Sequence, residues 1–190
     1  MKKIFIVFSM LLVGACLGGY SPQSKFYDLR SVGQQTEVVS NKKMSVGVND
    51  VELPAYLDKP QIVSFDVGNN QMEIDEFNRW GEPLASMIQR TIAADMSAYL
   101  PNSVVKIRSS LAEKFDLLVD VQIVRFDRFS GDEVVLEAWW FISNVNGKIL
   151  YRHKLLLKQK INSTYDGYVE AMSNLLAKMS KDMAFAIVQY

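Results

Sequence analysis

The chain has 190 residues, of which 49% are hydrophobic, and it carries 21 basic and 21 acidic side chains. This balance excludes a typical nucleic-acid-binding protein, which would show a clear excess of basic residues. A single histidine, His153, and a single cysteine, Cys16, exclude the usual zinc sites and any disulfide within the chain.

The N-terminus has the parts of a bacterial secretory signal in their usual order. Lys2 and Lys3 come first, the apolar run 4–13 follows, and small residues then lead to Cys16. The apolar run is shorter than the ~20 residues that a membrane-spanning helix needs. The segment 13–16 (VGAC) resembles a lipobox, in which the chain is cut before the cysteine and the cysteine is acylated. An ordinary signal peptide with an incidental cysteine is the alternative.

These features divide the chain into a signal peptide (1–15), a lipidated cysteine with a flexible tether (16–25) and one domain (26–190). We expect covalent acyl and diacylglycerol lipid on Cys16 and no other cofactor. Each CH₂ group buried in a membrane contributes about 0.8 kcal/mol to such an anchor. Because Gly18 stands where an Asp would signal retention at the inner membrane, the sequence resembles lipoproteins of the outer membrane, on its periplasmic face.

The first half of the domain has the alternating pattern of strands. We predict strands at 26–29, 44–53 and 61–67, and a partner for the third strand that contains Met72, Ile74 and Phe77. Pro54 and Pro60 bracket residues 55–59. Neither proline can donate a hydrogen bond to a sheet, so this segment is predicted to be an irregular loop or a broken edge.

Two amphipathic helices and a strand meander make up the second half. The first helix opens at Pro83 and stops at Pro101, and the second has an apolar stripe from Val169 to Ile187. Between them, alternation over 117–123, 134–142 and 149–157 predicts three antiparallel strands, with turns at 130–132 and at Asn146-Gly147. The fold class is therefore α/β, with a single mixed β-sheet, an antiparallel meander in the C-terminal half and two long helices.

The meander has a second apolar face, which carries Val135, Trp139 and Phe141. Either helices cover both faces of the sheet, or this face docks on another molecule. On the last predicted strand, a row of basic residues faces away from Leu155, on the side of this second apolar face: Arg152, Lys154, Lys158 and Lys160. Basic heads beside aromatic rings could bind anionic lipid headgroups or an acidic partner. The alternative is a solvated edge strand that its lysines protect from pairing.

No motif in the chain indicates catalysis. The nucleophile elbow G-x-S-x-G, the phosphate loop and the dinucleotide fingerprint are all missing from the sequence. His153 lies in an apolar stripe between Tyr151 and Leu155, which is typical of a packed strand residue. We therefore expect no enzyme and no catalytic, cofactor-binding or metal-binding residue. A periplasmic hydrolase built on His153 and scattered carboxylates is an alternative with little support.

Three stretches carry a resemblance to a known family: 26–29 (FYDL), 51–63 (VELPAYLDKPQIV) and 79–84 (RWGEPL). Together they resemble the paraquat-inducible protein C-like family of ABC-type transport auxiliary lipoproteins. The resemblance covers about residues 26–188. The middle stretch is the most specific of the three. Gly81 stands where we would expect Ala, which is a minor departure.

The resemblance implies a fold similar to the N-terminal domain of TolB and a non-enzymatic docking role in an MCE-type lipid transport system between the inner and outer membranes. The partners would be MCE-domain and membrane subunits, with self-association also implied. Candidate contact residues lie in the matched stretches, where a purely structural role is the alternative: Leu53, Pro54, Tyr56, Leu57, Pro60 and Trp80. The alternative function is a periplasmic carrier that binds acyl chains in its own cavity.

Overall fold

The computed structural model describes residues 22–33, 38–65, 71–110, 112–129 and 133–190. The predicted signal peptide, Cys16 and the predicted turn at 130–132 lie outside these residues. The elements are β1 (Lys25–Tyr27), β2 (Ser45–Glu52), β3 (Gln61–Phe65), β4 (Met72–Trp80), α2 (Leu84–Tyr99), β5 (Val104–Ile107), β6 (Leu117–Phe129), β7 (Glu133–Asn144), β8 (Ile149–Lys160) and α3 (Tyr165–Ile187). Within the described ranges, no helix is long and apolar enough to cross a membrane.

The long strand β6 organises the eight-stranded sheet. On one edge it pairs in parallel with two strands in succession, first β2, where Val46 is opposite Leu117, and then β3, where Ser64 is opposite Arg128. On its other edge it pairs antiparallel with β7, which in turn pairs with β8. The predicted antiparallel meander is therefore confirmed, and it is joined to a mixed sheet through β6.

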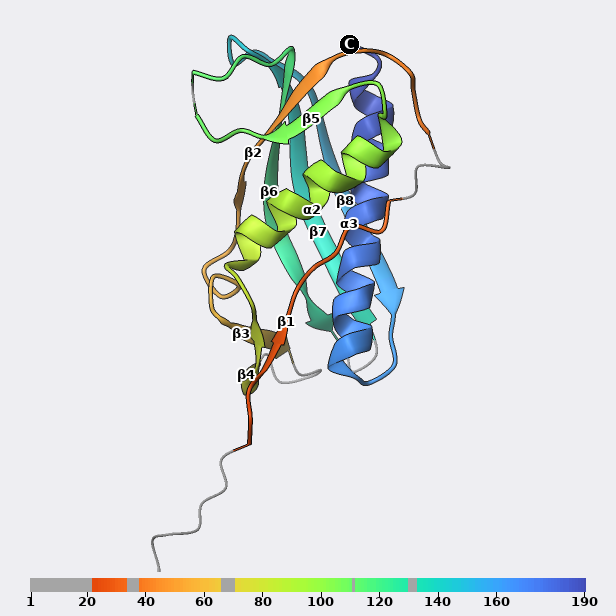
Figure 1. The fold of residues 1–190 in the computed structure, drawn as a ribbon. Coiled ribbons are helices and arrows are strands. Elements are labelled where there is room, and N and C mark those ends of the chain that lie inside the picture. The colour runs from red at the N-terminus through yellow and green to blue at the C-terminus, as the bar shows by residue number, and fades with distance from the viewer. Residues whose placement is uncertain (1–21, 34–37, 66–70, 111, 130–132) are drawn as a thin grey trace, which may run out of the picture.

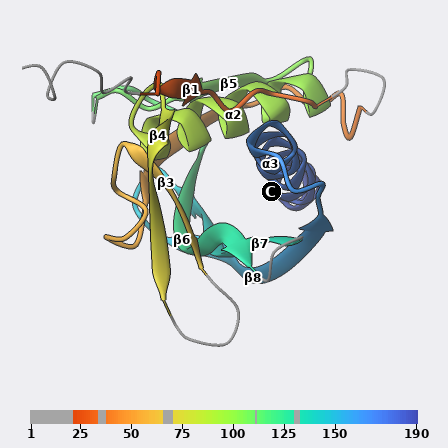
Figure 2. The same ribbon diagram turned by 90° about the horizontal axis from the view of Figure 1, so that it is seen from below.

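Both helices lie on the same side of the sheet, and Figure 2 shows α3 inside the sheet's curve. Helix α2 packs on β2 and β5, whereas α3 packs on β6, β7 and β8, and the two helices contact each other. Pro83 precedes α2, where its fixed φ of −53° and missing N–H cost the helix nothing. Thr164 caps α3 by accepting a hydrogen bond of 3.0 Å from the backbone N–H of Gly167.

One apolar core fills the space between the helices and the sheet. Alternate residues of β7 face it, and each is at most 1% exposed: Val134, Leu136, Ala138, Trp140 and Ile142. The predicted stripe of α3 supplies the opposite wall. Helices α2 and α3 therefore cover one face of the sheet, and we call the opposite side, on which the described residues form no helix, the outer face (Figure 1).

Two details differ from the sequence-based expectations. The short strand β5 was not predicted, because its four residues are largely exposed and show no clear alternation. It forms because the chain leaving α2 pairs in parallel with β2, with Ser45 opposite Val104. The first strand covers Lys25–Tyr27 rather than 26–29, and Leu29 leaves the strand to enter the core.

The glycine of β2 permits a close approach on the outer face. A Cβ atom on Gly47 would lie 2.7 Å from the ring of Phe115 and 2.9 Å from Leu118. We expect Gly47→Ala to lower the free energy of unfolding by about 1–3 kcal/mol, because packed side chains would have to move. Urea denaturation measures this loss. Gly81→Ala is the matched control, since a Cβ atom there would lie 3.4 Å from the carbonyl oxygen of Tyr27, and an equal loss in both variants would contradict the prediction.

Candidate partner-binding surface

The loop 53–60, part of the most specific matched stretch, bridges two strands that share one edge of β6. Its prolines prevent that segment from continuing the pairing. The backbone N–H of Leu57 donates to the carbonyl of Pro54 over 2.9 Å, and that of Trp80 donates to the carbonyl of Pro60 over 2.8 Å. The loop is thus a fixed turn that is tied to the end of β4.

Two of the candidate contact residues point inward. Leu57 is 3% exposed and Trp80 is 5% exposed, and both belong to the main core. The Trp80 ring lies 6.5 Å from the ring of Tyr168 on α3. The structural role that we weighed for these residues therefore accounts for Leu57 and Trp80. The more exposed members of the set, Leu53, Pro54 and Pro60, remain accessible at the surface.

Tyr56 is half-buried and holds a polar cluster together. Its hydroxyl donates to Oδ2 of Asp127 over 2.7 Å, and Nη2 of Arg125 donates to Oδ1 of the same carboxylate over 2.8 Å. The guanidinium of Arg125 also lies 5.8 Å from the ring centre of Phe65, which meets the Tyr56 ring edge-on. Burial and the bond to Asp127 raise the pKa of Tyr56, so its hydroxyl stays protonated and serves the fold.

The start of the loop meets the outer face at a hollow of about 370 Å³. The hollow is lined by Glu52, Leu53, Pro54, Gln122, Ile123, Val124 and Trp139. Successive side chains of a strand point to opposite faces of the sheet. Because Trp140 is buried in the core, its neighbour Trp139 lies on the outer face. Val124 is 42% exposed. The structure therefore joins two features that are far apart in the sequence, the matched loop and the apolar outer side of the meander.

The predicted basic row lies beside this hollow on the exposed strand β8. Arg152, Lys154, Lys158 and Lys160 are all exposed and share one side of the strand. The ammonium of Lys154 is 2.7 Å from the carboxylate of Glu137 and 5.7 Å from the ring centre of Trp139, and that of Lys158 is 3.0 Å from Glu133. The register places Phe141 opposite Arg152, as expected. Two of the four positive charges are thus paired with carboxylates of β7. This pairing is compatible with a solvated strand and with the rim of an interface.

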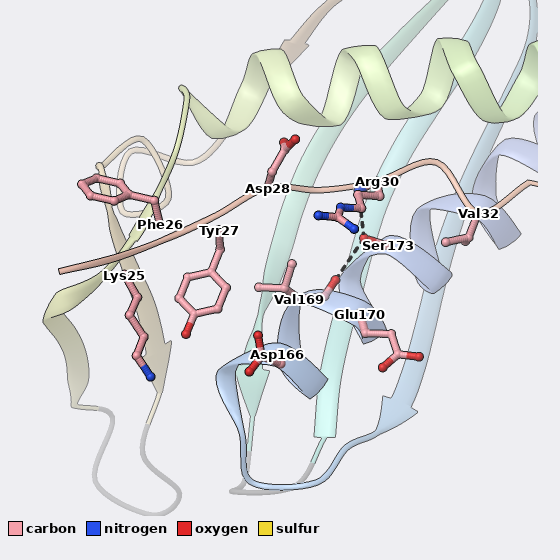
Figure 3. Close-up of a pocket in the computed structure, with 10 residues that line it drawn as sticks. All are labelled: Lys25, Phe26, Tyr27, Asp28, Arg30, Val32, Asp166, Val169, Glu170 and Ser173. Atoms are coloured by element: carbon pink, nitrogen blue, oxygen red, sulfur yellow. Dashed lines mark hydrogen bonds between the residues drawn. The ribbon is translucent and has the colours of Figure 1, made fainter. Parts of the chain in front are cut away.

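Another hollow, of about 650 Å³, was not anticipated from the sequence. It lies between the β1 segment and α3, and Figure 3 shows Tyr27 turned toward Asp166 while Phe26 and Asp28 point away. The backbone N–H of Arg30 donates to the hydroxyl of Ser173 over 3.2 Å and so ties the segment to α3. Charged side chains make up half of its lining: Lys25, Asp28, Arg30, Asp166 and Glu170. Such a lining does not suit acyl chains.

A buried carboxylate fixes the chain that leaves β1. Oδ1 of Asp95, on α2, accepts hydrogen bonds of 2.6 Å from the Ser31 hydroxyl, 3.0 Å from the Val32 N–H and 2.7 Å from the Gly33 N–H. Asp95 is 0% exposed. Burial raises its pKa, although the three hydrogen bonds favour the charged form and act in the opposite direction.

This carboxylate should make stability depend on pH. Because the pKa of Asp95 is raised by folding, the folded state takes up a proton more readily than the unfolded state. Wild-type protein should therefore gain stability relative to Asp95→Asn as the pH falls from neutral toward the usual aspartate range. Urea denaturation of both proteins at neutral and mildly acidic pH measures the difference. A constant difference would show that Asp95 titrates alike in both states.

His153 is a packed strand residue, as predicted. Its ring stacks on Tyr151 with the centres 6.2 Å apart and lies 5.5 Å from the Trp140 ring. Among the residues that the structure describes, no cluster of three or more histidine, cysteine or acidic side chains could hold a metal ion.

Comparisons with known proteins agree on one family. The family described as "ABC-type transport auxiliary lipoprotein component" matches residues 27–184. The chain is 26% identical to the intermembrane transport lipoprotein PqiC of Escherichia coli (strain K12) over 186 residues, which cover 97% of this chain and 95% of that protein. The PqiC of Shigella flexneri matches to the same extent.

Two solved structures share the fold. A crystal structure of an uncharacterised protein has a TM-score of 0.73 and 22% identity, and covers 87% of this chain and 99% of the other. The protein XCC0632 from Xanthomonas campestris has a TM-score of 0.70 and 12% identity, and covers 86% and 94%. At such identities, the likeness establishes the arrangement of the sheet and the two helices.

Proposed function

Because the chain belongs to the family of ABC-type transport auxiliary lipoprotein components, we propose that it is a non-enzymatic docking component of an MCE-type lipid transport system. In this proposal, lipid on Cys16 anchors the domain at the periplasmic face of the outer membrane. The domain contacts the MCE-domain and membrane subunits that move lipid between the inner and outer membranes. The likeness to the TolB N-terminal domain and self-association remain expectations from the family resemblance.

The observation that carries the docking proposal is the hollow on the outer face. Leu53 and Pro54 line it together with Val124 and Trp139, and both helices of the described residues, α2 and α3, lie on the other side of the sheet. Aromatic residues set beside exposed aliphatic ones are typical anchors of protein interfaces. The loop that presents Leu53 and Pro54 is held by backbone hydrogen bonds and by the Tyr56–Asp127 hydrogen bond. The loop therefore loses little conformational entropy when a partner binds.

The first experiment is purification of the full-length lipidated protein in mild detergent, with mass spectrometry of the proteins that co-purify. Recovery of MCE-domain and ABC-transporter subunits is the expected result. Recovery of lipid alone would favour the carrier function instead. A Cys16→Ala variant, which removes the attachment site, is expected to leave the membrane fraction.

The docking surface itself is tested with two exposed valines. Val124 lines the hollow and is 42% exposed, whereas Val104, on β5, is 52% exposed and lies outside it. Val124→Asp should abolish co-purification of the transport subunits, and Val104→Asp should leave it intact. A photo-crosslinking residue placed at each position should give adducts at 124 and none at 104. The reverse pattern would move the contact away from the hollow.

A further inference from the structure

A second hollow lies on the helix side of the sheet, away from the proposed docking surface. Its volume is about 470 Å³, and it opens between the first half of β8 and the C-terminal end of α3. Its lining residues are Trp140, Tyr151, His153, Asp182, Phe185, Ala186, Gln189 and Tyr190. Four of these eight side chains are Phe, Trp or Tyr, in a chain that is 11% Phe, Trp and Tyr, and His153 adds a fifth ring.

The rings form two walls. From the sheet, Tyr151 and His153 make one wall, with their rings stacked within 15° of parallel, and the buried ring of Trp140 lies behind them with its centre 5.2 Å from that of Tyr151. From the helix end come Phe185, which is 52% exposed, and Tyr190, which is held by a 3.0 Å bond from its hydroxyl to the carbonyl of Leu150. The faces of aromatic rings are electron-rich and attract cations.

The charges around the hollow also favour a cation. Asp182 supplies a carboxylate, and no lysine or arginine is among the lining residues. The C-terminal end of α3 adds the negative end of a helix dipole, and its last turn has no basic residue. The ammonium of Lys42 lies 3.4 Å from the carbonyl oxygen of Val188 and offsets part of this negative end, so Asp182 and the ring faces carry the attraction for a cation.

We propose that this aromatic hollow binds the ammonium group of an organic cation, as an amine or a quaternary ammonium. Ring faces and the carboxylate of Asp182 would replace the water around a bulky, weakly hydrated cation. The same chemistry is found in free amino alcohols and in the headgroups of zwitterionic lipids. The site needs no partner protein, so its test is independent of the docking proposal.

The test is isothermal titration of the full-length protein, in a detergent without amines, with choline. Its neutral carbon analogue, 3,3-dimethylbutan-1-ol, has nearly the same shape and no charge. Choline should bind at least about tenfold more tightly than the neutral analogue, because both the ring faces and Asp182 act on the charge. Equal binding of the two compounds, or no binding of choline, would overturn the proposal.

Variants of exposed residues locate the site without disturbing the core. Asp182→Asn and Phe185→Ala should each weaken choline binding by about fivefold, the loss expected from one exposed charge or cation–π contact. Asp166→Asn and Phe26→Ala are the matched controls, because both side chains are exposed and neither lines this hollow. Choline affinity that falls equally in the controls, or that does not change in the Asp182 and Phe185 variants, would place binding elsewhere.

A third titration separates the two sources of the cation. Dihexanoyl phosphatidylcholine, used below its micelle-forming concentration, carries the choline group on a short lipid. Binding tighter than that of free choline would assign the hollow to a lipid headgroup. Binding that is weaker or equal would assign it to a free organic cation. Both outcomes retain ammonium recognition, which the neutral analogue alone decides.

Discussion

Replacing Trp80 with alanine should lower the free energy of unfolding by about 3–5 kcal/mol, the range for a large aromatic residue removed from a core. Trp80 is 5% exposed, lies against Tyr168 of α3, and ends the strand that is tied to the matched loop through the carbonyl of Pro60. Its loss would leave a cavity where the loop, β4 and α3 meet. Urea denaturation, followed by far-UV circular dichroism, measures the effect.

Trp139 supplies the matched control within the same chain. It is only half-buried, on the outer face, and its polar contact is with the ammonium of Lys154. Trp139→Ala should cost less than half as much stability as Trp80→Ala, and should instead impair co-purification of the transport subunits. If Trp80→Ala were as stable as wild type but lost those subunits, Trp80 would be a contact residue and its placement in the core would be wrong.

Asp127→Ala is the second substitution with a large expected effect. The carboxylate is 0% exposed and accepts from both the Tyr56 hydroxyl and the Arg125 guanidinium. Its removal takes this acceptor from both groups, and breaking a buried, hydrogen-bonded pair costs several kcal/mol. Because the side chain of Arg125 is itself 27% exposed and can reach water, we expect a loss of about 2–4 kcal/mol.

A double-mutant cycle with Tyr56→Phe separates the two bonds. Tyr56→Phe removes one hydroxyl and should cost about 1 kcal/mol on its own. In the Asp127→Ala background the same change should cost much less, since the hydroxyl has already lost its acceptor. Full additivity of the two substitutions would show that the bond between Tyr56 and Asp127 contributes nothing to stability.

The parts of the fold that could be predicted were those whose pattern repeats along the chain. Residues 117–123, 134–142 and 149–157 alternate in sequence, and α3 shows its apolar stripe over its whole length, because each buries one side against a single core. The alternation of β6 breaks at the register shift between Ile123 and Arg125, so its second half was not predicted. Strand β5 could not be predicted, since it is short, largely exposed and defined by its partner β2 rather than by burial.

The candidate partner-binding surface could be predicted only in part, because its geometry depends on contacts between distant segments. The sequence singled out the loop 53–60 but gave no means of separating Leu57, which points inward, from Leu53, which lines the outer hollow. The partner of Tyr56 is 71 residues away, and it comes near because β2 and β6 run parallel, so that the loop leaving β2 lies beside the second half of β6. No local signal in the sequence marks such a partner. Side-chain bonds of Ser45 to Asp116 and of Asn49 to Asp120 span the same separation.

The central place of β6 has a consequence for the order in which the chain becomes compact. Strands β2 and β3 both need β6 as a neighbour, yet β6 follows them only after β4, α2 and β5. Until residues 117–129 are present, the N-terminal half has local pairs such as β3 with β4, and nothing that joins them into one sheet. Contacts between such distant segments form slowly, since a long loop must first close. The chain is therefore expected to collapse late and in one cooperative step, with β6 as the strand that completes the nucleus.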